Sequence, residues 1–168
     1  MRRSSCATTP ETKIKTMQPT AYPVRARIDV RWRDFDALKV VGVTAYFTYL
    51  EIARTTYYQK VFGSTELSGI DFMVVSAACD HLRPIRRLMT LDVGVAVSRV
   101  GKTSFDFDYH LTEMDGGAAL AHGRTTQVLY DYGAKVKIPL SEKWLECVRA
   151  AQGGLPPTSI AASASLVE

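Results

Sequence analysis

Apolar and polar residues alternate strictly along residues 24–33. The even positions hold apolar residues from Val24 to Trp32, and the odd positions hold charged residues from Arg25 to Arg33. Successive side chains of a strand point to opposite faces, so an alternation with a period of two is typical of a half-buried strand. The pattern therefore predicts a strand over residues 24–33 whose even-numbered side chains lie in the core.

A different pattern covers residues 44–62, which contain neither glycine nor proline. Apolar residues recur there at helical spacing in a stripe from Tyr46 to Val61, and further aromatic residues make the remaining sides apolar as well. Gly63 follows, and glycine is common directly after the last turn of a helix. The pattern predicts a long helix that the rest of the protein encloses, because a helix that is apolar nearly all round is not suited to a surface.

Four more segments have strand-like patterns, and a short helix follows them. The strands are expected at residues 70–78, 91–97, 105–112 and 119–130. Short turns with glycine, at residues 100–102 and 115–117, join the last three strands, which makes them antiparallel neighbours. A short final helix is expected over residues 141–151, with Ser141 as its N-cap.

The order of these elements predicts an α+β architecture, in which a curled antiparallel sheet of about five strands is wrapped round one long central helix. One helix cannot both cover such a sheet and hide its own far side. We therefore expect two copies of the chain to pair through an edge strand or a helix face. The folded domain is expected at residues 22–152, and the aperiodic residues 1–21 and 153–168 are expected to be tails.

The net charge of +4 over 168 residues first suggests a nucleic-acid partner, but the charge is unevenly placed. Residues 1–33 hold eight basic and two acidic residues, whereas the rest of the chain holds 13 basic and 15 acidic ones, a net of −2. A nucleic-acid-binding domain clusters its basic residues on the folded surface. No apolar run approaches the roughly 18–20 residues of a membrane span. We expect a cytoplasmic protein without a nucleic-acid or membrane partner, although the first 21 residues leave a transit peptide as an alternative to a plain tail.

Several kinds of chemistry lack their usual signals. Cys6, Cys79 and Cys147 lie far apart in the sequence, with no histidine at metal-ligand spacing, so free thiols and no metal ion are expected. No G-x-S-x-G, G-x-G-x-x-G or P-loop motif occurs, which leaves serine hydrolases, dinucleotide enzymes and nucleoside triphosphatases without support. We therefore expect no cofactor.

Two carboxylates, Asp34 and Asp36, follow the first strand and precede the long helix by fewer than ten residues. If the alternation continues, both point inward. A partly desolvated carboxylate near a helix start is suited to act as a base or a nucleophile. The alternative, that both aspartates only cap the turn into the helix, stays open.

A set of basic residues further along the chain is either a solvated edge or a site for a phosphate-bearing ligand. Its members are Arg83, Arg86, Arg87, Arg99 and Lys102, with the hydroxyls of Thr103 and Ser104 beside them.

A set of spaced residues follows the first strand: Asp34, Asp36, Val41, Tyr46, Glu51, Ala53 and Arg54. Their order resembles the opening motif of hotdog-fold acyl-CoA thioesterases of the 4-hydroxybenzoyl-CoA type, roughly D-x-D-x-x-G-x-V-x-x-x-x-Y-x-x-x-x-E-x-A-R. Later segments also match that family: His81–Ile85, Val100–Phe105, Gly123–Thr126 and Ile138–Leu140. The resemblance covers about residues 24–150.

The resemblance implies a hotdog fold, a homodimer or a homotetramer built as a dimer of dimers, and an active site at the subunit interface. It implies hydrolysis of an acyl thioester of coenzyme A or of an acyl carrier protein. Asp36 matches the family's catalytic aspartate, which acts as nucleophile or general base, and backbone amides at the helix start would polarise the thioester carbonyl. The implied substrate-binding residues are Gly42, Val43, Thr44, Tyr46, Arg86, Lys102, Thr103 and Ser104.

The sequence departs from the family pattern in the loop before the helix. Lys39 stands where the family usually has glycine, and Val40, Gly42 and Val43 stand where polar residues are common. Backbone amides survive such changes, and an apolar loop would suit a longer aliphatic acyl group. The alternative to hydrolysis is a non-catalytic hotdog module that binds acyl groups or a partner protein. Hydration or dehydration of an acyl thioester is ranked lower, because it commonly uses a histidine and none lies between Asp36 and Ile70.

Overall fold

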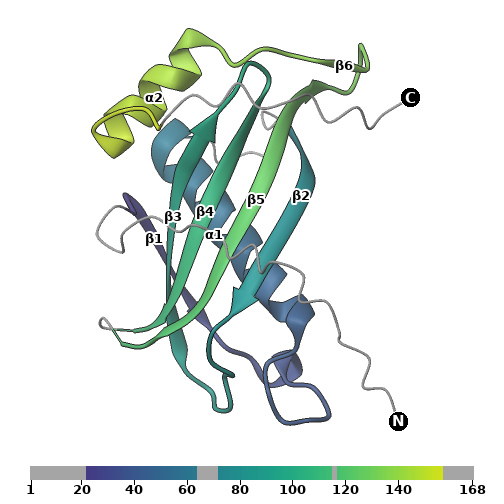
Figure 1. Cartoon of the computed structure of the whole chain (residues 1–168), viewed down its shortest axis with the longest axis vertical. Coiled ribbons are helices and arrows are strands. Elements are labelled where there is room, and N and C mark those ends of the chain that lie inside the picture. Colours follow the sequence, from purple (N-terminus) through teal and green to yellow (C-terminus); the bar gives the residue numbers. More distant parts are fainter. Residues whose placement is uncertain (1–21, 64–71, 115–116, 157–168) are drawn as a thin grey trace, which may run out of the picture.

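A six-stranded antiparallel sheet packs one face against the long helix α1 in the computed structural model (Figure 1). The structure describes residues 22–63, 72–114 and 117–156. The strands are β1 (Val24–Asp29), β2 (Phe72–His81), β3 (Thr90–Val100), β4 (Ser104–Glu113), β5 (Ala119–Asp131) and β6 (Val136–Lys137). The helices are the 3-10 helix η2 (Trp32–Asp34), α1 (Val43–Phe62) and α2 (Glu142–Gln152). The strand order is β1-β3-β4-β5-β2, with β6 paired to β5, which confirms the predicted α+β architecture.

The number of elements differs from the predicted one of about five strands round one long helix. The sixth strand, β6, is only two residues long, which is too short to leave an alternation in the sequence. The expected final helix is present as α2, so the fold has a second helix beside α1. The Trp144 ring of α2 stacks on the Phe62 ring of α1, with ring centroids 5.7 Å apart. The expected tail at residues 1–21 and most of the one at 153–168 lie outside the described residues, as do the first two positions of the expected strand at 70–78.

The first strand is shorter than its alternation predicts. β1 ends at Asp29, and Trp32–Asp34 form η2 instead of continuing the strand. The backbone amide of Arg31 donates a 2.9 Å hydrogen bond to the Asp34 carboxylate, which holds the chain in this turn. Trp32 consequently lies in water, with 80% of its surface exposed, and its predicted place in the core is wrong.

Helix α1 buries one side against the sheet and leaves the other side open. Tyr49, Leu50 and Ala53 are buried, whereas Phe47 and Ile52 remain exposed on the far side. A Cβ on Gly123 of β5 would lie only 2.8 Å from the Leu50 side chain, so a glycine is needed where the helix approaches the sheet. The expectation that the helix is enclosed therefore does not hold for a single chain, because the sheet covers only one side of it.

Strand β2 forms an edge of the sheet with apolar residues in water. It pairs with β5 on one side, and none of the strands in the described residues pairs with it on the other. Five consecutive residues, Val74 to Ala78, are exposed, including Val74 at 42% and Val75 at 53%. An unpaired strand edge with exposed valines favours pairing with another strand. The free edge of β2 is thus suited to pairing with another strand, and the pairing of two copies through an edge strand or a helix face stays a prediction.

Candidate active site

The residues between η2 and α1 form a tight loop that presents Asp36. The Asp36 amide donates to the carbonyl of Val40 at 2.9 Å, and the Lys39 amide donates to the carbonyl of Asp36 at 3.0 Å. Lys39 has a positive φ of 58°, a left-handed conformation that glycine adopts most readily. This backbone requirement accounts for the glycine that the related motif usually has there.

The Asp36 carboxylate points into solvent rather than into the core. Its Oδ1 accepts a 2.8 Å hydrogen bond from the Leu38 amide, within its own loop. The prediction that Asp36 faces inward is wrong, because η2 interrupts the alternation on which it relied. Asp36 is therefore exposed and held by its loop, a position from which it can reach a bound molecule.

Asp34, in contrast, is buried and fully engaged. Its carboxylate accepts hydrogen bonds from the Arg31 side chain at 3.0 Å and from the Tyr49 hydroxyl at 2.7 Å, besides the one from the Arg31 backbone. Burial by itself would raise the pKa of Asp34, but the hydrogen bonds from Arg31 and Tyr49 outweigh it and hold that pKa below its ordinary value. Asp34 thus serves as an anchor of the structure.

Neither aspartate caps α1. The Asp34 side chain accepts the amide of Arg31, the N-cap of η2, and the N-cap of α1 is Gly42, without any side-chain hydrogen bond to the helix start. Within the part of the chain that the structure describes, the amides of Val43 and Thr44 have no acceptor. A Cβ on Gly42 would lie 3.8 Å from the Cβ of Asp36, so the helix start adjoins the catalytic candidate. Unpaired amides at a helix N-terminus favour a negative charge.

A pocket of about 260 Å³, here named the helix-start pocket, opens at this place. Its walls include Asp36, Val43, Tyr46 and His81. The rings of Tyr46 and His81 meet edge to face, with centroids 4.3 Å apart. Burial raises the pKa of Tyr46, so its phenol keeps its proton at neutral pH. The pocket thus combines a carboxylate, helix amides and an imidazole.

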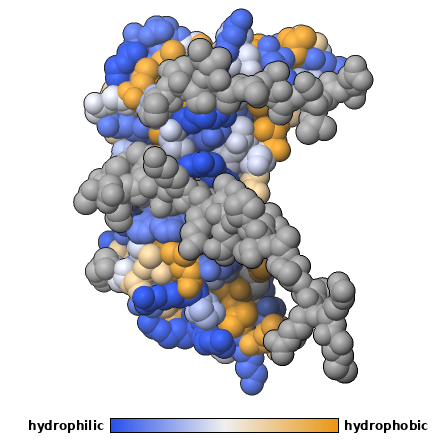
Figure 2. Space-filling model, viewed as in Figure 1, coloured by the Kyte–Doolittle hydropathy of each residue, from blue (hydrophilic) through white to orange (hydrophobic). Residues whose placement is uncertain are grey.

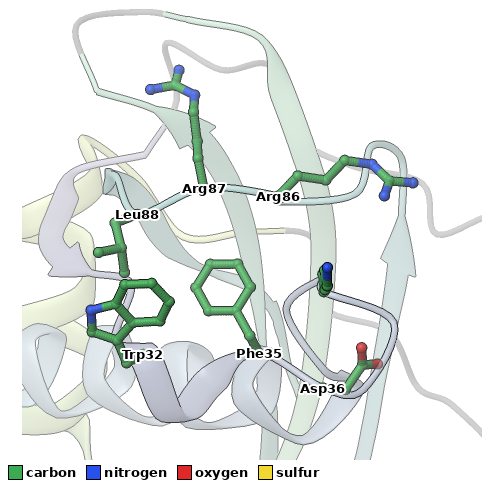
Figure 3. Close-up of a pocket in the computed structure, with 7 residues that line it drawn as sticks. Trp32, Phe35, Asp36, Arg86, Arg87 and Leu88 are labelled. Atoms are coloured by element: carbon green, nitrogen blue, oxygen red, sulfur yellow. The ribbon is translucent and has the colours of Figure 1, made fainter.

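A second pocket, the η2 pocket, lies against the same loop and has a volume of about 350 Å³ (Figure 3). Figure 3 shows the rings of Trp32 and Phe35 side by side, with Leu88 next to Trp32. Asp36 lines this pocket as well as the helix-start pocket. The remaining lining residues are Lys39, Arg86 and Arg87.

The structure brings together only part of the expected site. Asp36, Gly42, Val43, Thr44 and Tyr46 gather at the helix start. Arg86 lies nearby, in the η2 pocket.

The remaining expected residues, Lys102, Thr103 and Ser104, lie elsewhere in the same chain. Lys102 and Thr103 lie in the turn between β3 and β4, and Ser104 is the first residue of β4, at the end of the sheet opposite to η2 (Figure 1). Arg86 precedes β3 and Lys102 follows it, so the 11 residues of β3 separate them. At about 3.3 Å per residue, a strand of that length is roughly 36 Å long. One chain therefore does not unite the expected basic set.

His81 is a site residue that the sequence argument passed over. The search for a histidine looked between Asp36 and Ile70, but His81 reaches the pocket from the end of β2. A signal was present, because His81 opens one of the segments that resemble the thioesterase family. In contrast, no group of three metal-binding side chains is placed to hold a metal ion in the described residues.

Comparison with known proteins identifies the class. Residues 30–150 match the family model of the thioesterase-like superfamily, and the chain belongs to that family. A thioesterase from Thermus thermophilus, solved in complex with coenzyme A and zinc, is 34% identical in sequence. It superposes with a TM-score of 0.71 over 79% of this chain and 96% of that one. The fold is thus the hotdog fold that the sequence resemblance implied.

Two further proteins are similar to this chain. The 1,4-dihydroxy-2-naphthoyl-CoA thioesterase Slr0204 from Synechocystis has a TM-score of 0.66 over 74% of this chain and 94% of that one, and at 21% identity it supports the fold alone. Protein YsmA from Bacillus subtilis, described as uncharacterized, is 26% identical over 97 residues, which span 58% of this chain and 66% of that protein. Family and neighbours support acyl-thioester hydrolysis as the general activity. No helix in the described residues is long and apolar enough to cross a membrane.

Proposed function

We propose that this protein hydrolyses an acyl thioester of coenzyme A or of an acyl carrier protein, with Asp36 as nucleophile or general base. One observation carries the proposal: the exposed Asp36 carboxylate adjoins the unpaired amides of a helix start at an open pocket. Thioester hydrolysis needs a group that attacks or activates water and donors for the developing oxyanion. Both lie within the helix-start pocket.

The chemistry follows from this placement. The thioester carbonyl oxygen accepts hydrogen bonds from the amides of Val43 and Thr44, and the α1 dipole stabilises the negative charge that develops on it. In one route an Asp36 oxygen bonds to the carbonyl carbon, the C–S bond breaks, and water then hydrolyses the anhydride. In the other route Asp36 takes a proton from water as the water oxygen attacks that carbon. In both routes the thiolate leaves and takes up a proton.

His81 supplies polar chemistry that this loop lacks. The related motif often has polar side chains where this chain has Val40, Gly42 and Val43. His81 lies across the helix-start pocket, where its imidazole can orient the attacking water or protonate the leaving thiolate. Its contact with Tyr46 supports one side of the ring.

A dimer through β2 would complete the site. β2 starts at Phe72, which pairs with Leu129, and the Leu129 amide donates to the carbonyl of Thr103. The start of β2 therefore lies near Lys102, whereas its end, His81, lies in the helix-start pocket. If two β2 strands pair antiparallel about a two-fold axis, the end of one meets the start of the other. Lys102 of the partner subunit then lies at the Asp36 end, where it can meet the phosphates of the carrier. We propose this dimer, or a pair of such dimers, as the active form.

Two alternatives to hydrolysis each have one observation in their favour. Hydration of an unsaturated acyl thioester is favoured by one observation, that His81 and Asp36 line one pocket. A non-catalytic module that binds acyl groups or a partner protein is favoured by the valines of the loop. A cytoplasmic location, without nucleic-acid or membrane partners, remains part of the proposal.

The test is hydrolysis by the purified protein of acyl-CoA and acyl-carrier thioesters, from acetyl to palmitoyl and benzoyl, followed by release of free thiol. We expect turnover by the wild type and a loss of at least about 100-fold in Asp36→Asn. Asp131→Asn is the matched control, because the Asp131 carboxylate also accepts amide hydrogen bonds within its own turn, at 2.8 Å. The absence of hydrolysis with every thioester, or an unaffected Asp36→Asn, would reject the proposal. Binding without product release would favour the non-catalytic module.

A further inference from the structure

We infer that the η2 pocket is the acyl pocket and that it takes acyl groups whose apolar body ends in a carboxylate, such as monothioesters of dicarboxylic acids. The inference rests on the proposed hydrolysis and names its substrate class. It is carried by the position of the η2 pocket relative to Asp36, by its apolar floor and by its uncompensated cations.

The first argument is the position of the η2 pocket relative to Asp36. Asp36 lines both pockets, so a carbonyl that Asp36 attacks at the helix start has the η2 pocket on its other side. The helix-start pocket includes His81, at the end of the edge strand β2, where the carrier would enter along a dimer seam. The sulfur side of the thioester therefore points toward β2. The acyl side of the thioester then points into the η2 pocket. This pocket lies between the residues that follow β1 and those that precede β3, at the edge of the sheet opposite to β2.

The floor of the η2 pocket is apolar and lies open to solvent. Trp32 and Leu88 are 80% and 45% exposed, and the rings of Trp32 and Phe35 have centroids 6.4 Å apart. Figure 2 shows hydrophobic surface beside hydrophilic surface at the lower end of the molecule, where Figure 1 places η2. Small-molecule sites are typically concave, mostly apolar and 300–1,000 Å³ in volume, a range that includes this pocket. The apolar body of an acyl group would cover this floor.

The rim of the η2 pocket is positively charged. In the described residues Lys39 and Arg86 have no ion pair, and Arg87 has only a long one, 3.5 Å from Glu113. Figure 3 shows the head groups of Arg86 and Arg87 extending away from the aromatic rings in different directions, with that of Arg86 on the side of Asp36.

Three arginines of the sheet have close acidic partners. Arg25, Arg99 and Arg124 each pair with an aspartate at 2.7–2.8 Å. The rim cations are therefore available to a ligand, and a carboxylate is the group that an arginine fork pairs with best. The terminal carboxylate of an acyl group on the floor would pair with this rim, where Arg87 extends above the apolar side chains and Arg86 extends on the side of Asp36.

The test compares two substrates of equal chain length, octanedioyl-CoA and octanoyl-CoA, which differ by the terminal carboxylate. We expect the wild type to have a kcat/KM about tenfold higher for octanedioyl-CoA, and Arg86→Gln/Arg87→Gln to reduce that ratio to about one. Trp32→Ala is expected to lower kcat/KM for both substrates. Arg149→Gln is the matched control, because Arg149 has a similarly long ion pair, 3.7 Å from Glu142, on α2. It is expected to leave the ratio unchanged.

A wild-type ratio of one or less would overturn the inference, as would a ratio that the double variant leaves unchanged or a Trp32→Ala that alters neither substrate. Binding of the two thioesters to Asp36→Asn, measured by calorimetry, separates this result from failure of the proposed hydrolysis. If neither thioester is hydrolysed but octanedioyl-CoA binds more tightly and loses that advantage in the arginine variants, the pocket assignment stands and the hydrolysis does not. Equal affinities would overturn the assignment.

Discussion

The Tyr49 hydroxyl of α1 donates a 2.7 Å hydrogen bond to the buried carboxylate of Asp34. Asp34 closes η2, and its backbone carbonyl accepts the amide of Gly42, the N-cap of α1, at 2.8 Å. Both ends of the Asp36 loop are therefore tied to the same helix. The position of the Asp36 carboxylate relative to the helix start depends on this pair of residues.

Removal of this hydrogen bond by Tyr49→Phe is expected to lower the free energy of unfolding by about 1–3 kcal/mol, because a buried carboxylate loses a donor. It should lower kcat more than it changes KM, since the Asp36 loop loses a fixed point. Urea unfolding and thioester kinetics measure the two effects. Tyr132→Phe is the control: it removes a hydroxyl that donates to the Phe72 carbonyl on the surface, and a change within about 0.5 kcal/mol is expected. Equal unfolding midpoints for both variants would contradict the anchor role of Tyr49.

His81→Phe tests the imidazole in the helix-start pocket. Phenylalanine keeps an aromatic ring against Tyr46, so stability and KM should change little. We expect kcat to fall about 10- to 100-fold, because a positioned acid or base typically contributes that much or more. The measurement is steady-state thiol release from the best substrate. A variant with the kcat of the wild type would show that His81 is only part of the pocket wall.

Val74→Lys tests the dimer. A lysine on an exposed strand edge disfavours pairing with another strand, so we expect the variant to be monomeric by light scattering where the wild type is dimeric or tetrameric. Loss of the partner should also raise KM, because Lys102 of the partner subunit no longer reaches the carrier. Val136→Lys places the same charge on an exposed valine of β6 and serves as the control. A dimeric Val74→Lys, or a fully active monomeric wild type, would contradict the proposed interface.

The outer face of the sheet predicts a dependence of stability on pH. The rings of His110 and His122 stack there with centroids 4.8 Å apart, and Tyr22 stacks on His110. Burial is the main cause that lowers the pKa of both histidines. The charges of His122 and Arg25 also lower the pKa of His110, and Asp92 opposes that shift. Asp80 and Asp108 oppose the lowering of the pKa of His122.

Because both folded pKa values lie below the unfolded value of about 6.5, the unfolded chain binds more protons as the pH falls. The contribution of these histidines to stability should be complete above about pH 6.5 and decrease as the pH falls below that value toward 5. Thermal unfolding across that interval measures the effect. His110→Phe retains a stacked ring without a proton site, so its melting temperature should vary less with pH. The same pH dependence in the variant and the wild type would show that this stack is not responsible.

Much of the fold could be read from local patterns. The predicted helix at 44–62 differs from α1 by one residue, and the predicted strand at 119–130 differs from β5 by one. These patterns are reliable because one face of each element is buried and its period records that burial. β1 was predicted four residues too long, because a hydrogen bond from Arg31 to Asp34 turns the chain into η2, and no periodicity encodes that bond.

The candidate site could be predicted only where it is local. The aspartates and the helix start lie within ten residues of each other, so their proximity follows from the sequence. Which aspartate is buried does not: Tyr49, fifteen residues away, engages Asp34 and leaves Asp36 exposed. His81 reaches the same pocket through the pairing of β2 with β5, a contact between distant segments.

The sequence by itself determined the α+β class, the long helix, the family resemblance and Asp36 as the candidate catalytic residue, because each follows from the spacing of residues that are close together in the chain. Only the tertiary structure decided how Asp34 and Asp36 differ, that His81 lines the same pocket as Asp36, and that Arg86 and Lys102 lie beyond opposite ends of β3. The physical reason is that strand pairing and side-chain hydrogen bonds join residues far apart in the chain. The pattern of apolar and polar positions records which side of a residue is buried, but not which distant residue lies against it.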